Sequence, residues 1–242
     1  MQLAPRLHRV GNELVNLYLV EDAGGVTVID SGLPGHWGDL ERELRAMGRS
    51  LDDVRALVLT HGDTDHIGFA QRLHAERGVP VYVHEADVAR ARKKVAKPNS
   101  GWGPVRFGPF LRFLVYTGLR GGLRIPAVRD LMPIGGDATL DVPGAPRIIH
   151  VPGHTPGSVA IHVPAVDAIF LGDAMTTRDV LTGVSGARLA PFTLDRRQAL
   201  ASLARLDGVD ARWVLPGHGD PWDGGLAAAL AEIRASSVSE GA

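Results

Sequence analysis

The stretch Thr60-His61-Gly62-Asp63-Thr64-Asp65-His66 places four candidate metal ligands, two imidazoles and two carboxylates, within six residues. It directly follows the apolar run Ala56–Leu59, which we expect to be a buried strand. A cluster of ionisable groups at the end of a buried strand is costly unless a cation neutralises it. Imidazole nitrogen together with carboxylate oxygen suits zinc, iron or manganese better than calcium, which prefers oxygen alone. The sequence therefore predicts a transition-metal site here.

Three later segments repeat one arrangement: a short apolar run, a break that contains glycine, and then a single histidine or aspartate. Glycine permits the sharp turn and proline stops the strand, so these side chains should meet at one rim of the sheets. A turn residue is the simpler interpretation of any one of them, but four such strand ends in one chain favour a shared site. The residues placed in this way are His154, Asp173 and His218.

Together these motifs resemble the signature of the metallo-β-lactamase superfamily, in which His-x-His-x-Asp-His precedes a distant histidine, aspartate and histidine. The similarity extends from the N-terminal strands through Asp30 to His218 and covers nearly the whole chain. It implies an α+β fold, the four-layer αββα sandwich, with two packed mixed β-sheets and helices on the outer faces. We expect one such domain over residues 1–242, with the ligands along one edge of the sheets.

The resemblance also assigns roles to individual residues. It implies two zinc ions, with iron or manganese as alternatives. One ion would be held by His61, Asp63 and His154, and the second by Asp65, His66 and His218, with Asp173 bridging the two. Asp65 would also be the catalytic residue that orients the nucleophile or accepts its proton. Asp30 would support the ligand loop from behind, although a turn residue after a strand is an equally good interpretation.

Two residues depart from the family pattern. Asp63 stands where the pattern has its second histidine, and Phe69 stands where a second glycine often follows. Aspartate is a competent ligand, but it lowers the charge of the centre by one unit, to zero with two divalent ions and a bridging hydroxide. A neutral centre attracts anions less strongly and acidifies its bound water less. We therefore predict that Asp63→His lowers the apparent pKa of the activity profile.

Composition sets broad limits on the function. The chain has 242 residues, 45% of them hydrophobic, which is enough for a substantial core. The net charge of −1 gives no overall field for nucleic acid or a membrane surface, and the absence of cysteine excludes disulfides and thiolate ligands. No signal peptide and no apolar stretch long enough to cross a membrane is present. We expect a cytoplasmic enzyme that binds a small-molecule substrate, with a homodimer left open.

Residues 92–130 interrupt the regular pattern. They contain nine of the 26 basic residues and one acid, Asp130, together with five of the thirteen aromatic residues. One interpretation is an inserted helix that packs on the body or on another subunit. The other is a lid over the metal centre, whose aromatic and basic side chains contact the substrate. On the second interpretation the candidate substrate contacts are Trp102, Phe107, Phe110 and Tyr116.

Several local features can be tested against the structure. Helices are expected over 67–77 and from Glu85 to about Lys97, and Asp195 should cap a helix, with Gln198 three residues later. The remaining histidines are expected to be packing or surface residues. We expect His36 to lie at the surface.

Metal-assisted hydrolysis is the reaction that the resemblance favours. A bridging hydroxide would attack an ester, lactone, thioester or related bond, with phosphodiesters as a weaker alternative. The chain after His218 is too short for the helical domain of glyoxalase II members, and Ala174 to Thr177 lack the tyrosine of acyl-homoserine lactonases. A different reaction class remains open, since His61, His154 and Asp173 match the ligand type of mononuclear iron dioxygenases that resemble persulfide dioxygenases. A metal-stabilised binding protein without turnover is a third possibility.

Overall fold

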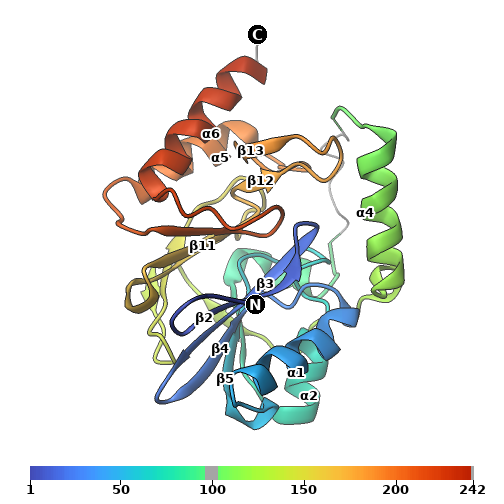
Figure 1. Cartoon of the computed structure of the whole chain (residues 1–242), viewed down its shortest axis with the longest axis vertical. Helices are drawn as coiled ribbons and strands as arrows, with labels where there is room; N and C mark the ends of the chain where they lie inside the picture. The colour runs from blue at the N-terminus through green and yellow to red at the C-terminus, as the bar shows by residue number, and fades with distance from the viewer. Residues whose placement is uncertain (96–102, 241–242) are drawn as a thin grey trace.

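The computed structural model describes residues 1–95 and 103–240, and its larger sheet follows the order of the chain (Figure 1). The first four strands form an antiparallel meander. The last four, which include β4, are parallel, because helical crossovers connect them, with α1 (Trp37–Ala46) between β4 and β5 and α2 (Ala70–Arg77) between β5 and β6. The seven strands are β1 (Gln2–Ala4), β2 (Leu7–Asn12), β3 (Val15–Asp22), β4 (Gly25–Ile29), β5 (Val54–Val58), β6 (Val81–His84) and β7 (Met132–Ile134).

A second sheet of five strands comes from the C-terminal half. Its order is β14-β11-β10-β9-β8, and all neighbours are antiparallel except β11 and β14. A small two-stranded sheet, β12 (Thr176–Arg178) with β13 (Ser185–Arg188), lies beside it. The five strands are β8 (Ala138–Thr139), β9 (Arg147–His150), β10 (Val159–Val163), β11 (Ala168–Gly172) and β14 (Trp213–Pro216).

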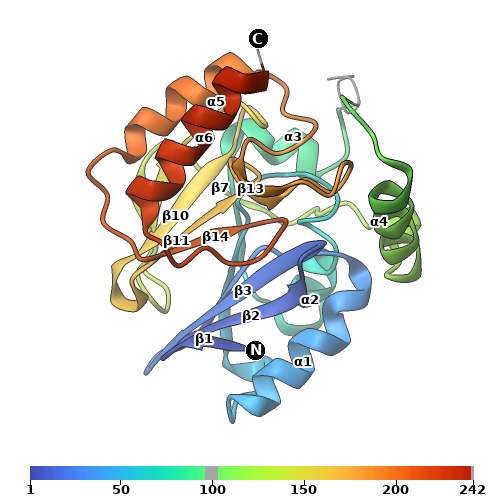
Figure 2. The same ribbon diagram turned by 45° about the horizontal axis from the view of Figure 1, so that its top comes forward.

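Three hydrophobic clusters separate the layers. Alternation along β3 explains them, because Leu17 and Leu19 point to the cluster under α1 and α2, whereas Tyr18 and Val20 point to the cluster between the sheets. The third cluster joins the second sheet to α5 (Arg196–Ser202) and α6 (Leu226–Glu240). Helices therefore cover the outer face of each sheet, as Figures 1 and 2 show. This arrangement confirms the predicted αββα sandwich.

The remaining helices differ in part from the sequence-based expectations. The expected helix over 67–77 begins only at Ala70, since residues before it belong to the ligand loop. The expected helix from Glu85 is a 3-10 turn followed by the short α3 (Val88–Ala91), and Lys93 has a φ of +54° that a helix does not allow. The Asp195 cap is confirmed, with its carboxylate accepting from the Gln198 amide.

The segment expected to be a lid or an interface contains α4 (Phe107–Leu119), which stands at the right-hand edge of both views (Figures 1 and 2). Trp102, one of the candidate substrate contacts, lies outside the described residues. Among the described helices, none is both long and apolar enough to cross a membrane.

Candidate metal centre

The loop after β5 is held from behind by Asp30. This aspartate directly follows β4 and has a φ of +60°, and its carboxylate accepts hydrogen bonds from the Thr60 amide and hydroxyl, each at 2.7 Å. It also accepts Nδ1 of His66 at 2.8 Å. Asp30 thus lies in the supporting position that the family resemblance implies, and it fixes both ends of the ligand loop.

The first group of candidate ligands joins the two halves of the molecule. His61 and Asp63 come from the loop after β5, and His154 comes from the loop after β9. The Asp63 Oδ2 atom lies 3.4 Å from Nε2 of His154 and 4.0 Å from Nε2 of His61. All three residues are buried.

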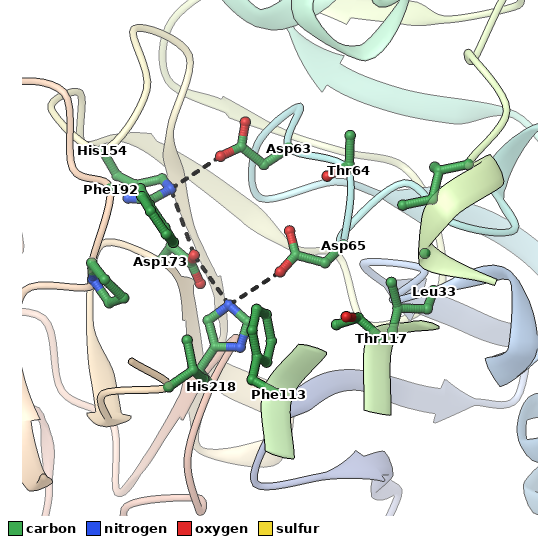
Figure 3. Close-up of a pocket in the computed structure, with 14 residues that line it drawn as sticks. Leu33, Asp63, Thr64, Asp65, Phe113, Thr117, His154, Asp173, Phe192 and His218 are labelled. Atoms are coloured by element: carbon green, nitrogen blue, oxygen red, sulfur yellow. Dashed lines mark ion pairs between the residues drawn. The ribbon is translucent and has the colours of Figure 1, made fainter. Parts of the chain in front are cut away.

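The second group lies beside the first, with Asp173 between them (Figure 3). Nε2 of His218 is 3.5 Å from Oδ2 of Asp65. Asp173 approaches three histidines, with its carboxylate oxygens 3.3 Å from His218, 3.4 Å from His66 and 3.5 Å from His154. The structure therefore brings all seven predicted ligands around one point.

These separations suit bound cations better than hydrogen bonds. Donor atoms around a tetrahedral ion with bonds of about 2.1 Å lie about 3.4 Å apart. Among the described residues, the buried Nε2 atoms of His61, His66 and His154 and Oδ1 of Asp173 have no hydrogen-bond partner. Buried polar atoms are rarely left unsatisfied, so the site fits metal ions.

The Nδ1 atoms of the histidines explain why their Nε2 atoms face the centre. Thr60 donates its hydroxyl proton to Asp30, so the contact between Thr60 Oγ1 and Nδ1 of His61 at 3.0 Å requires the histidine to donate. Thr193 donates to a backbone carbonyl, so Nδ1 of His154 donates to Thr193 in the same way. His218 donates from Nδ1 to the Leu14 carbonyl. With Nδ1 fixed as the donor, Nε2 of each ring is the nitrogen that can present a lone pair to a bound cation.

Asp87 is a supporting residue that the sequence did not reveal. Its carboxylate is fully buried and accepts the amides of Gly62 at 2.7 Å and Gly157 at 2.9 Å. It also accepts the Thr155 hydroxyl at 2.7 Å. One carboxylate therefore joins the loop that carries His61 to the loop that carries His154.

Arg90, on the same short helical segment, contacts a candidate ligand directly. Its Nε donates to Oδ1 of Asp63 at 2.5 Å, and its side chain is 9% exposed. This leaves Oδ2 of Asp63 facing the two histidines. The charge predicted from the sequence omitted this cation, and counting Arg90 raises the charge of the centre by one unit.

In the metal-free protein, the residues of the centre shift one another's pKa values. Burial and the neighbouring imidazoles hold the pKa of His61 well below its ordinary value. Burial opposes charge on His218, but the carboxylates of Asp173 and Asp65 prevail and raise its pKa to about 9. Burial would raise the pKa of Asp173, yet His218 and His66 hold it well below its ordinary value. In the metal-free cluster, a protonated His218 thus supplies positive charge beside the ionised Asp173, where a metal cation would otherwise lie.

Glycine is required where the strand ends meet. A Cβ atom on Gly217 would lie 2.4 Å from Oδ1 of Asp173 and 2.6 Å from the His66 ring. Gly172 has a φ of +50°, and its Cβ would lie 2.2 Å from the Thr60 hydroxyl. The glycines before Asp173 and His218 therefore allow the two candidate ligands to approach the first loop.

A cavity of about 180 Å³ opens over the centre. Figure 3 shows Phe113 of α4 and Phe192 lining it together with five of the candidate ligands, Asp63, Asp65, His154, Asp173 and His218. The Phe113 ring lies 6.0 Å from the His218 ring. Phe192 has a φ of +62°, an unusual conformation for a bulky residue that often accompanies functional sites. A second cavity, of about 580 Å³, shares Pro191 and Phe192 with the first.

Of the aromatic residues predicted as substrate contacts, Phe107, Phe110 and Tyr116 do not line the first cavity. Phe107 is 79% exposed, and Phe110 is half-buried. Tyr116 instead bonds through its hydroxyl to Nε2 of His36 at 2.8 Å. The expectation that His36 lies at the surface is wrong, because its Nδ1 accepts the Leu33 amide inside the turn before α1.

A family model of the metallo-beta-lactamase superfamily matches residues 10–218. The chain belongs to this superfamily and is an enzyme of it, which confirms the resemblance drawn from the motifs. The probable metallo-hydrolase YflN of Bacillus subtilis (strain 168) is 26% identical over 239 residues, 92% of this chain and 87% of the relative. The uncharacterized protein Rv2581c of Mycobacterium tuberculosis is 31% identical over 216 residues, 85% of this chain and 86% of the relative.

Solved structures give the same result. The metallo-beta-lactamase family protein TTHA1429 from Thermus thermophilus has a TM-score of 0.69 and 25% identity, over 99% of this chain and 80% of that one. TTHA1623, solved in a di-iron-bound form, has a TM-score of 0.60 and 27% identity, over 89% of this chain and 93% of that one.

Proposed function

We propose that the protein is a metal-dependent hydrolase with a dinuclear zinc centre that cleaves an ester, lactone or thioester. The observation that carries the proposal is the pair of ligand groups on either side of Asp173, with buried imidazole nitrogens facing each group. The first ion would be held by His61, Asp63 and His154, the second by Asp65, His66 and His218, with Asp173 shared between them.

Two bound zinc ions would supply a hydroxide near neutral pH and polarise the bond under attack. Asp65 is suited to the proton transfer, because its side chain is 19% exposed and lines the cavity, whereas His66 and Asp173 are more deeply buried. A carboxylate in this position can orient the nucleophile and accept its proton.

The walls of the cavities support a small, partly apolar substrate. Leu33, Phe113, Ile125 and Val180 line the cavity beside the candidate ligands and exclude water from the reacting bond. Because this cavity is small, the substrate's larger part would extend past Phe192 into the second cavity. Phe113 is therefore our candidate for a direct substrate contact.

The charge of the centre also bears on the substrate class. Arg90 compensates the carboxylate of Asp63, so the centre keeps one positive charge with two zinc ions and a hydroxide bound. That charge favours the anionic transition state of acyl transfer.

An iron enzyme is the second candidate, because TTHA1623 was solved with two irons and His61, His154 and Asp173 form a two-histidine, one-carboxylate set. The second group favours a dinuclear centre, and so the hydrolase over a mononuclear dioxygenase, since Asp65, His66 and His218 bring their ligand atoms within 4.8 Å of one another. A mononuclear centre would not need that group.

Elemental analysis and activity assays on the untagged protein test the proposal. We expect two zinc ions per chain and turnover of at least one ester, lactone or thioester, with turnover lost in Asp65→Asn. Asp207→Asn, a change in an exposed ion pair with Arg234, is the matched control. One iron per chain with oxygen uptake would identify a dioxygenase, and bound metal without turnover across the panel would identify a binding protein.

A further inference from the structure

Helix α4 carries an apolar ridge that no described residue covers. Its members Phe107, Leu111, Leu114, Val115 and Leu119 are 43–84% exposed, and α4 contains no buried residue. Leu123 extends the ridge beyond the helix and is 91% exposed. Contiguous apolar surface of this kind on a soluble protein marks an interaction site.

The helix has two distinct faces. At about 100° per residue, the five ridge residues fall within an arc of roughly 140°. The opposite face is the one that holds the helix to the body, where Phe113 and Tyr116 pack against the first core cluster. The ridge is therefore an outward-facing surface of a packed helix, because a different face of α4 already packs against the body of the protein.

Cations bracket the ridge. Arg106 precedes α4 and Arg124 follows it, and both side chains are exposed with no ion pair to any described residue. Within α4 and just after it, Arg112 and Arg120 are bound to Glu13 and Asp39. Every charged residue from 92 to 129 is basic, so this edge of the molecule is locally cationic although the net charge is −1.

This charge pattern distinguishes between possible partners. A second copy packed on the same ridge would bring Arg106 against Arg106 or against Arg124, depending on the direction of the helices. Neither arrangement offers a carboxylate from the segment, and like charges across an interface oppose association. An apolar ridge flanked by arginines instead matches a helix that lies in the interface of an anionic bilayer.

We propose that α4 docks the enzyme onto anionic lipid surfaces, with the ridge among the acyl chains and Arg106 and Arg124 at the headgroups. In this orientation the opposite face of the same helix, with Phe113 and Thr117, borders the cavity over the metal centre. Val115 and Leu119 of the ridge line neither cavity, so docking can be tested separately from the proposed reaction, whereas Arg106 also lines the second cavity.

Vesicle flotation with the full-length protein tests the proposal. We expect binding to phosphatidylcholine vesicles that contain about 30% phosphatidylglycerol, and binding weaker by about tenfold or more to phosphatidylcholine alone. Raising the salt concentration should weaken binding to the anionic vesicles, because part of the attraction is electrostatic.

Substitutions on the ridge locate the contact. Val115→Glu combined with Leu119→Glu changes exposed side chains only, so the fold should persist, while vesicle affinity should fall by about tenfold or more. Arg106→Glu combined with Arg124→Glu should remove the preference for anionic lipid. Met132→Glu is the matched control, because Met132 is 51% exposed on β7, outside the ridge, and its replacement should leave binding unchanged.

Light scattering coupled to size-exclusion chromatography completes the test, with a monomer expected for the wild type and for the ridge variant. A wild-type dimer that becomes a monomer in Val115→Glu/Leu119→Glu, without vesicle binding, would assign the ridge to a second copy. Absence of flotation in the wild type, or flotation that the ridge variant retains, would equally overturn the proposal.

Discussion

The N-terminal half of the molecule places four candidate ligands on one loop, whereas the C-terminal half places one on each of three loops. The single loop is fixed by two carboxylates, Asp30 behind it and Asp87 beside it. The three C-terminal loops are instead positioned by strands β9, β11 and β14, each of which ends at the edge that faces the loop.

This difference indicates where each half is vulnerable. The N-terminal ligands depend on hydrogen bonds to the loop backbone, because Gly62 and Thr60 are held by side-chain carboxylates. The C-terminal ligands depend on close packing, because Gly172 and Gly217 leave no room for a Cβ atom. Asp173 is the point at which the halves meet, since it approaches His66 from one half and His218 from the other.

Loss of Asp173 should therefore have the largest effect. Asp173→Ala removes the carboxylate that both groups share, so we expect fewer than two metal ions per chain and activity reduced by about a thousandfold or more. Metal content measured alongside turnover separates loss of the centre from loss of the fold. Retention of both ions would show that the two groups bind independently.

The link between the halves at Asp87 should have the next largest effect. Asp87→Ala leaves two buried amides and the Thr155 hydroxyl without their acceptor, so we expect a loss of roughly 3 kcal/mol in the free energy of unfolding. Urea unfolding of the metal-free protein measures this change in the free energy of unfolding, and Asp52→Ala, at an exposed aspartate, is the control. A loss below about 1 kcal/mol would mean that water replaces the carboxylate.

The same contrast explains what the sequence could predict. The candidate ligands from His61 to His66 lie within one short segment, so they can be recognised directly in the sequence. The pattern of an apolar strand followed by glycine was sufficient to select Asp173 and His218. The layers of the fold followed from the family motifs and from alternation along the strands. These features depend either on residues that are adjacent in the sequence or on motifs that occur in a fixed order along the chain.

Long-range partners could not be predicted in this way. Asp87 and Arg90 follow an ordinary strand and acquire their roles only because the helical segment packs against two loops distant in sequence. Similarly, the rotation of α4 determines that Phe113 faces the cavity while Tyr116 bonds to His36, and a run of aromatic residues does not fix that rotation. The composition of residues 92–130 indicated that this segment could contact the substrate, but it did not indicate which aromatic residue faces the cavity.

Protonation offers a smaller and reversible way to probe the C-terminal half. In the metal-free protein the pKa of His218 is raised to about 9 from 6.5, so its stabilising charge is fully present below pH 6.5 and lost as the pH rises through 9. The full shift corresponds to about 3 kcal/mol, and because the neighbouring groups titrate together we expect the metal-free protein to lose only part of it, roughly 2 kcal/mol, over this window. Unfolding measured across pH tests this, and the loss should shrink in His218→Asn and with zinc bound.

The smallest effect should come from the ion pair between Asp63 and Arg90 in the first ligand group. Changing this pair tests whether Asp63 is a metal ligand. Asp63→His removes a negative charge, so the bound water becomes more acidic and the apparent pKa of the activity profile should fall by roughly one unit. Arg90→Met removes the compensating cation and should raise that pKa by a similar amount. The double variant restores the charge of the wild type, so its pKa should return close to the original value. A double variant that follows either single variant would show that Arg90 acts on the fold of the loop and not on the charge of the centre.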